Sequence, residues 1–308
     1  MSIQSSKLNQ IEFAQVSKHP LFEGGGNVKG RQLKSSVFSF ACFTLTFLVL
    51  GVVGYLLLDT LFQGAHWFSF DYFNSFASRF PDQSGIKAPL FGTIWLLVIT
   101  LAFSVPVGVT TGIYLEELME RGTLYRLISN NINNLAGVPS VVYGLFGLAI
   151  FVRFLGFERS VLSGGLTLGI MSLPTIVIAT REAIYAIPPS IRLGALAMGA
   201  TKWQTTRDQI FPSALPGIMT GVILSLSRAL GETAPLIIAG AVSFLAFVPH
   251  SPLDSYTALP MQIYNWVSKP QEEFHQLAAA TIIVLLGVLM AANSLAIFIR
   301  IRSRRVNL

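Results

Sequence analysis

The stretch "SRALGETAPL", residues 227–236, places an arginine and a glutamate inside an otherwise almost wholly apolar run. Arg228 and Glu232 are four residues apart, so in a helix they lie on one face and can form an ion pair. A charge at membrane depth is costly, and such residues therefore face a partner or water. The planar guanidinium of Arg228 suits a tetrahedral oxyanion, which it can hold through two hydrogen bonds. The pair indicates either a structural lock between helices or a contact for an anionic substrate.

A second group of residues lies between two apolar runs, in the loop of residues 181–217. Pro188 and Pro189 interrupt the preceding helix, because proline lacks the N–H that a helix interior needs. The pattern then predicts a short helix that Ser190 caps and Gly199 ends, followed by a second helix that Thr201 caps. Such a loop is either an amphipathic segment on lipid or a docking element for a cytoplasmic partner. The residues of the predicted docking element are Ser190, Arg192, Ala195, Met198, Gly199, Ala200, Thr201, Trp203 and Pro212.

The elements that must position these residues are six apolar runs, each near the roughly 20 residues that a helix needs to cross a bilayer. They cover residues 37–62, 90–115, 135–155, 161–180, 215–248 and 277–299. Arg228 lies about 20 Å along the fifth predicted helix, near mid-membrane, at the usual rise of an α-helix. Pro235 cannot donate to the Gly231 carbonyl, which predicts a free polar group beside the pair. The sequence predicts an all-α integral membrane protein with six transmembrane helices.

Composition supports this class, since 52% of the 308 residues are hydrophobic and only 12% are charged. Soluble domains average nearer a quarter charged. Of the 21 lysines and arginines, fifteen fall on the cytoplasmic side if the N-terminus is cytoplasmic, five on the other side, and Arg228 inside. The positive-inside rule therefore predicts cytoplasmic N- and C-termini. The net charge of +6 is explained by segments that face anionic lipid, without nucleic acid.

The chain divides by composition into a flexible cytoplasmic N-terminal tail (1–36), a six-helix membrane domain (37–300) and a basic C-terminal tail (301–308). Two glycine-rich stretches could suggest nucleotide chemistry. "EGGGNVKG" in the tail does not have the spacing of a phosphate-binding P-loop. "LSGG", residues 162–165, imitates part of an ABC-type ATPase signature, but it lies where an apolar run enters the membrane. No catalytic residue, metal site or bound cofactor is predicted for this chain.

The loop of residues 187–214 resembles the cytoplasmic loop of permease subunits of bacterial ABC importers. Their pattern is Glu-Ala-Ala, three residues, Gly, nine residues, an apolar residue, one residue, then Leu-Pro. Aligned on Gly199, Leu193 takes the place of the glutamate, and Pro212 fits at the expected separation. The stretches "GVPSVVYGLFGL", "SLPTIVIATREAI", "LAMGATKWQT", "PGIMTGVILSLSRALGETAPL" and "ALPMQIYNW" extend the likeness to permeases of phosphate-specific ABC importers, over residues 88–267.

This resemblance implies a type I importer permease fold with a cytoplasmic coupling helix, in a bacterial cytoplasmic (inner) membrane. It implies a related companion permease, two ABC ATPase subunits that bind ATP and Mg²⁺, and an extracytoplasmic phosphate-binding protein. Arg228, Glu232 and Thr233 would then line the route of inorganic phosphate, and Trp203 would anchor the ATPase. Glu232 can accept a proton-bearing phosphate oxygen, a contact that sulfate does not offer. The alternatives are a permease for another oxyanion, a secondary transporter or channel that acts alone, and a structural scaffold.

Overall fold

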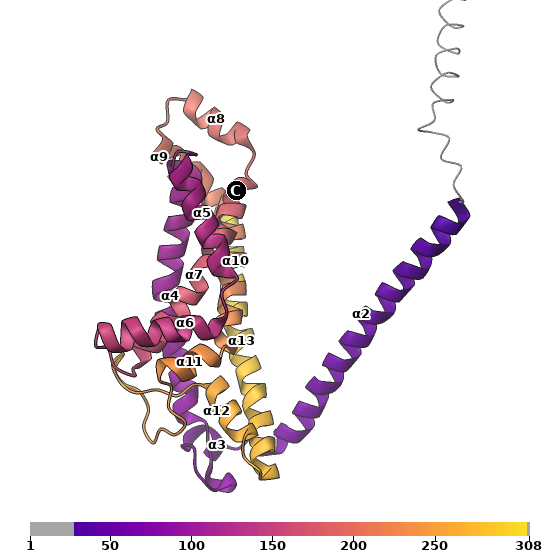
Figure 1. Cartoon of the computed structure of the whole chain (residues 1–308), viewed down its shortest axis with the longest axis vertical. Helices are drawn as coiled ribbons and strands as arrows, with labels where there is room; N and C mark the ends of the chain where they lie inside the picture. The colour runs from indigo at the N-terminus through magenta and orange to yellow at the C-terminus, as the bar shows by residue number, and fades with distance from the viewer. Residues whose placement is uncertain (1–27, 307–308) are drawn as a thin grey trace, which may run out of the picture. The chain divides into compact units, whose positions relative to one another are not determined.

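The computed structural model describes residues 28–306, and every regular element in that range is a helix (Figure 1). The chain divides into two compact units, with the boundary after Asp59, inside helix α2 (Val28–Gly64). Helix α2 contains the predicted first span and exposes large apolar side chains from Leu33 to Phe62. A helix that is apolar around its whole circumference is suited to a hydrocarbon surrounding.

The predicted N-terminal tail of residues 1–36 is wrong for residues 28–36, which form the first turns of α2. This segment contains Lys, Arg, Gln and Leu, all good helix formers, and it contains no proline. The rest of the predicted tail, residues 1–27, lies outside the described residues.

The second unit is built on four long helices: α4 (Lys87–Ile113), α7 (Val161–Tyr185), α10 (Phe211–Gly231) and α13 (Glu272–Val306). Helices α4 and α7 approach closely through glycine. A Cβ atom on Gly108 of α4 would lie 2.7 Å from the Ile176 side chain, and one on Gly165 of α7 would lie 2.6 Å from Ile99. Small residues at such contacts let membrane helices pack backbone against side chain.

The predicted third span, residues 135–155, is not one continuous helix. Helix α5 (Thr123–Ala136) stops before Pro139, and the chain resumes as α6 (Ser140–Gly147) and the π-helix η4 (Leu148–Phe154), bent by 105° from α5. Proline disfavours helical geometry in the residue before it, so the helix breaks at this point. Within the described range, five helices are long and apolar enough to cross a membrane, or six if this bent pair counts as one span.

The predicted fifth span, residues 215–248, also ends early. Helix α10 stops at Gly231, and a short helix, α11 (Ala234–Ala239), follows it. Gly240 ends α11 with a φ of 108°, a conformation that glycine adopts at no steric cost. Residues 241–258 then form an irregular loop before α12 (Leu259–Val267).

The irregular loop is tied to the start of α7. The Val161 N–H donates to the Asp254 carbonyl oxygen, and the Leu162 N–H donates to the Pro252 carbonyl oxygen. The Asp254 carboxylate accepts hydrogen bonds from the Ser251 and His250 N–H groups, which hold the pKa of that carboxyl below its usual range. These hydrogen bonds fix the path of the loop beside the start of α7.

The last helix, α13, contains the predicted sixth span and continues through Val306, so residues 301–306 of the predicted C-terminal tail are helical. The arginine-rich sequence has no proline or glycine to stop the helix there. At the other end of the unit lie the 3-10 helices η1 (Ala65–Trp67) and η2 (Pro81–Gln83) and the short helix α3 (Phe70–Asn74). Tyr72 of α3 and Thr281 of α13 form a buried hydrogen bond of 2.7 Å between their hydroxyls.

Candidate functional site

The predicted ion pair of Arg228 and Glu232 forms, but at a helix end rather than in the middle of a helix. Arg228 lies in the last turn of α10, and Glu232 is the residue that caps it in extended conformation. Arg228 Nε is 3.4 Å from Glu232 Oε1. A cation near a helix C-terminus is favourable because it faces the negative end of the helix dipole.

Pro235 has a different role from the one predicted. It is in the first turn of α11, where a missing N–H costs nothing because that group would have no partner in the helix. Helix α10 has already ended four residues earlier, so the predicted continuous helix through Pro235 is wrong. Thr233 stands at the start of α11, is half-buried, and makes no capping hydrogen bond with its side chain.

The two members of the pair differ in exposure. The Arg228 side chain is 56% exposed and the Glu232 side chain 20%. The next residues on α10, Ala229 and Leu230, are buried in the bundle. The guanidinium therefore faces away from the core of this chain, toward a surface left for water, lipid or another protein.

Two polar residues near the pair escaped the sequence analysis. The charge of Arg228 acts on the Tyr143 phenol of α6, whose hydroxyl donates to the Leu135 carbonyl oxygen at 2.8 Å. Ser227, beside Arg228, donates to the Asn293 amide oxygen of α13 at 3.0 Å. Both residues are polar groups inside apolar runs. Polar residues in such runs mark functional contacts in membrane proteins, and this was the sequence signal that could have identified them.

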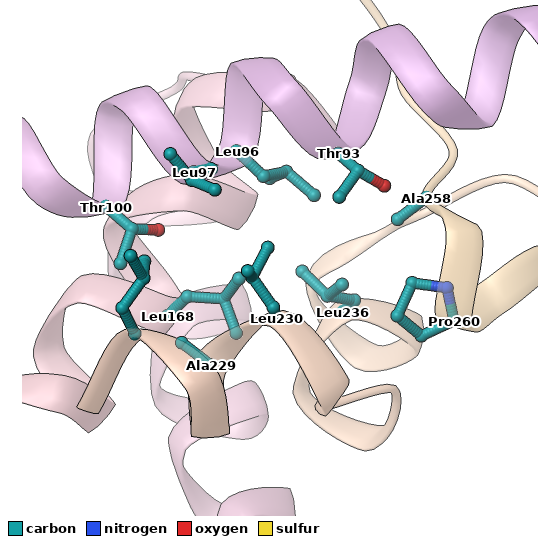
Figure 2. Close-up of a pocket in the computed structure, with 11 residues that line it drawn as sticks. Thr93, Leu96, Leu97, Thr100, Leu168, Ala229, Leu230, Leu236, Ala258 and Pro260 are labelled. Carbon is teal, nitrogen blue, oxygen red and sulfur yellow. The ribbon is translucent and has the colours of Figure 1, made fainter. Parts of the chain in front are cut away.

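The cavity beside the C-terminal end of α10 does not offer a route for an ion. A small cavity of about 10 Å³ lies between α4, α7, α10, α11 and α12. Figure 2 shows side chains that line it. The hydroxyls of Thr93 and Thr100 already donate to the carbonyl oxygens of Pro89 and Gly165. Leucines and alanines form most of the remaining wall, and the space is about the smallest that admits one water molecule. The exposed side of Arg228, not this cavity, is the candidate substrate surface.

The predicted loop helices are confirmed. Helix α8 (Pro189–Ala197) is followed by Gly199 with a φ of 89°, and then by α9 (Lys202–Thr205). Thr201 accepts a hydrogen bond from the Gln204 N–H while the Gln204 side chain accepts one from the Thr201 N–H, which makes a full capping box. The π-helix η5 (Thr206–Ile210) joins α9 to α10. Pro212 lies in the first turn of α10 and is half-buried.

The predicted cap at Ser190 is wrong. Helix α8 begins at Pro189, which leaves Ser190 inside the first turn with no capping hydrogen bond. Proline is favoured at the first position of a helix because its backbone angle already fits.

Several loop residues form an exposed apolar surface. The side chains of Leu193, Met198 and Trp203 are among the exposed large apolar groups, with Met198 exposed by 88%. Ala195 and Ala200 are half-buried. Trp203 also borders a groove of about 540 Å³ between the end of α4 and the start of α10. These side chains are free within this chain to contact another protein.

Arg192, in contrast, is engaged inside the chain. Its Nε and one terminal nitrogen donate to Glu117 Oε1, and its guanidinium also donates to the carbonyl oxygens of Ile184 and Ile187. Glu117 belongs to the π-helix η3 (Tyr114–Leu118), which continues α4. The sequence analysis placed Arg192 on the docking surface. The structure shows this side chain held by a partner 75 positions away in the sequence, and a part for Arg192 in docking stays a prediction.

No group of three or more His, Cys, Asp or Glu side chains that could hold a metal ion occurs among the described residues. The arrangement offers an exposed cation at one helix break and an exposed apolar loop surface at one end of the bundle. Both arrangements suit binding.

Comparison with known proteins supplies the context for these two surfaces. Residues 104–306 match the family described as "Binding-protein-dependent transport system inner membrane component". The chain is 31% identical over 292 residues to "Phosphate transport system permease protein PstA 1" of Mycobacterium tuberculosis, covering 90% of the chain and 92% of that protein. It is 29% identical over 212 residues to "Probable ABC transporter permease protein YqgI" of Bacillus subtilis, covering 69% and 71%.

Solved structures support the fold. A bacterial ABC transporter involved in the import of the acidic polysaccharide alginate has a chain with a TM-score of 0.59 and 18% identity, covering 91% of this chain and 97% of that chain. A chain of the MetNI methionine ABC transporter, in an inward-facing conformation, has a TM-score of 0.56 and 21% identity, covering 72% and 97%. The predicted all-α importer permease fold is thereby confirmed. Two thirds of the sequence matches one family and the fold agrees with it, so the chain belongs to the inner membrane components of binding-protein-dependent transport systems.

Proposed function

We propose that this chain is the membrane-spanning permease subunit of an ATP-driven importer of inorganic phosphate. The observation that carries the proposal is Arg228, an exposed cation at a helix break in a membrane-spanning bundle, paired with Glu232. A charge in this setting needs water, a partner or a charged substrate. A relative that is similar over 90% of the chain is named a phosphate transport permease, which supports phosphate as the anion.

The guanidinium and the carboxylate can share the work of recognition. Arg228 offers a planar set of donors to the phosphate oxygens. Glu232 accepts a hydrogen bond from the protonated oxygen of phosphate, and Thr233 adds a hydroxyl at the same break. Because the ion pair, at 3.4 Å, is longer than a strong charge-assisted hydrogen bond and is largely exposed on the arginine side, an anion can compete with Glu232 for the guanidinium.

The route would lie between two permeases. Arg228 faces away from the bundle, and the cavity beside α10 is too small and apolar for an ion. A companion permease would close the exposed side of the route. The chain is also 31% identical to "Phosphate transport system permease protein PstC" of Mesorhizobium japonicum, covering 63% of the chain and 67% of that protein, which supports a related second permease.

Energy would come from separate subunits. The exposed apolar side chains of Leu193, Met198 and Trp203 would dock one of two ATPase subunits, which hold the ATP and Mg²⁺, and the companion permease would dock the other. A binding protein outside the cytoplasm would deliver the phosphate. This chain would bind no cofactor and hydrolyse nothing itself.

Reconstitution tests the proposal. The chain is assembled in liposomes with its companion permease and ATPase, and uptake of radiolabelled phosphate is measured with binding protein and ATP. We expect uptake that requires both and that excess sulfate does not inhibit. Uptake of sulfate instead would favour a permease for another oxyanion. Phosphate movement by the chain alone, without an ATPase, would favour a secondary transporter.

A further inference from the structure

Two consecutive acidic residues after the end of α4, Glu116 and Glu117, form ion pairs with two different helices. Glu116 Oε2 is 3.4 Å from Arg181 Nε of α7, and Arg181 also donates to the Tyr125 hydroxyl of α5 at 2.7 Å. Glu117 Oε1 accepts from two nitrogens of Arg192 of α8, at 2.6 and 2.9 Å. Both acids lie in the π-helix η3, and π-turns inside longer helices are frequent at functional sites.

Arg192 ties three elements together. Beyond its two bonds to Glu117, it donates to the Ile184 carbonyl oxygen at 2.9 Å and to the Ile187 carbonyl oxygen at 3.1 Å. These carbonyls belong to the end of α7 and the turn after it, where helix carbonyls lack partners within the helix. One guanidinium therefore joins the end of α4, the end of α7 and the loop helix α8.

Apolar packing does not fix α8 in place, because none of its residues is buried. The contact between Glu117 and Arg192 is more protected, with the two side chains 9% and 24% exposed. Charge-assisted hydrogen bonds of this length are about twice as strong as neutral ones. Opening the contact would leave Glu117 as an unpaired charge in a mostly water-free place, which is unfavourable.

We infer that Glu117 and Arg192 form a strut that stays closed during transport and passes each movement of α8 to α4 and α7 together. The inference rests on the proposed function, in which an ATPase moves α8. A loop without such contacts would move without displacing the long helices. A loop bound to two long helices transmits the movement to them as a rigid body. Both residues act through position and contact no substrate.

Neutralising the strut tests its role in the complete complex of both permeases, ATPase and binding protein. Glu117→Gln keeps the shape of the side chain and removes its charge. We expect the complex to assemble and hydrolyse ATP, while phosphate moved per ATP falls roughly tenfold, a size typical of coupling between two sites. Arg192→Lys should also lose coupling because lysine has no planar fork. Arg126→Gln, which changes an exposed arginine of α5, is the matched control and should keep the wild-type ratio.

A covalent link between the two positions distinguishes a contact that stays closed during transport, a strut, from a contact that must open. Glu117→Cys and Arg192→Cys are combined in a Cys42→Ser background and joined by a short bifunctional thiol reagent. A strut predicts that the joined complex regains the coupling that the unjoined double variant lacks. If joining the two positions abolishes uptake that the unjoined form retains, the contact must open during transport and the strut is wrong.

Hydrogen exchange supplies a readout that is independent of the substrate. In Glu117→Gln, amides of residues 189–197 should exchange faster than in the wild type and in Arg126→Gln. Unchanged exchange and an unchanged coupling ratio would each contradict the strut. A wild-type complex that moves no phosphate would overturn the proposed function alone, because the exchange measurement still decides the strut.

Discussion

Arg228 and Arg192 are both paired arginines, yet their surroundings assign them to different tasks. Arg192 is held by one carboxylate and two carbonyl oxygens, so its donors are committed within the chain. Arg228 has one contact to Glu232 at 3.4 Å and is 56% exposed, so most of its donors are available. An exposed ion pair contributes about 0–1 kcal/mol to stability. This contribution is too small to explain the pair as a structural lock alone.

Replacing Arg228 tests the substrate contact. Arg228→Gln should abolish phosphate uptake in the reconstituted complex while the subunits assemble in normal amounts, because glutamine keeps polarity but loses the charge that holds the anion. Assembly is measured by co-purification and uptake by radiolabelled phosphate. The double variant Arg228→Gln with Glu232→Gln is the discriminating control. Restored uptake in that variant would identify the pair as structural and reject the phosphate contact.

At the scale of elements, the loop between α7 and α10 depends on one backbone conformation. Gly199 separates α8 from α9 with a φ of 89°, and a Cβ atom there would meet no neighbour within 4 Å. Space is therefore available, but the backbone angle is unfavourable for any residue with a side chain. The cost of such a left-handed conformation is roughly 1–2 kcal/mol for an ordinary residue.

Gly199→Ala should therefore loosen the junction of the two loop helices and reduce transport without preventing insertion in the membrane. Gly194→Ala is the matched control, since Gly194 lies inside α8 with no neighbour near a Cβ atom and with no positive φ. Alanine there should stabilise the helix by roughly 0.5–1 kcal/mol. Thermal unfolding and uptake are measured for both variants. Equal effects of the two changes would show that the conformation of Gly199 is unimportant.

At the scale of the whole molecule, orientation in the membrane decides which surface meets which partner. In the second unit, α8, α9 and the C-terminal end of α13 lie at one end, and α3 lies at the other (Figure 1). The distribution of basic residues predicts that the first of these ends is cytoplasmic.

Reporter fusions test this orientation. An enzyme that is active only outside the cytoplasm should be silent when fused after Leu308 and active when inserted after Asp82, beyond the end that carries α3. Activity is compared after normalising for the amount of each fusion in the membrane. The reverse pattern would invert the topology and place the loop helices on the wrong side for an ATPase.

The loop surface is the second test at this scale. Met198→Cys and Trp203→Cys, in a Cys42→Ser background, should crosslink to the ATPase with a yield that changes when nucleotide binds, because both side chains are exposed. Phe154→Cys, also highly exposed but on η4, is the control and should not crosslink to the ATPase. Modification of the loop cysteines by lipid-soluble reagents alone would reject docking.

Features that depend on neighbouring residues could be predicted from the sequence. The length of apolar runs predicted four spans well, because the cost of burying the backbone in lipid depends on local composition. Local capping chemistry predicted the break at Gly199 and the cap at Thr201, and the spacing of Arg228 and Glu232 predicted their contact. The caps and the ion pair each join residues that are only a few positions apart in the chain.

Features that depend on residues far apart in the chain became visible only in the folded structure. The 105° bend after α5 and the exposure of Arg228 at the end of α10 are tertiary features, and no local rule gives a direction in space. Glu117 and Arg192 are separated by 75 positions in the sequence. Considered alone, each is an ordinary charged residue at a membrane boundary. Their pairing exists because α4 and α7 pack side by side through their glycines and bring the two helix ends to the same place.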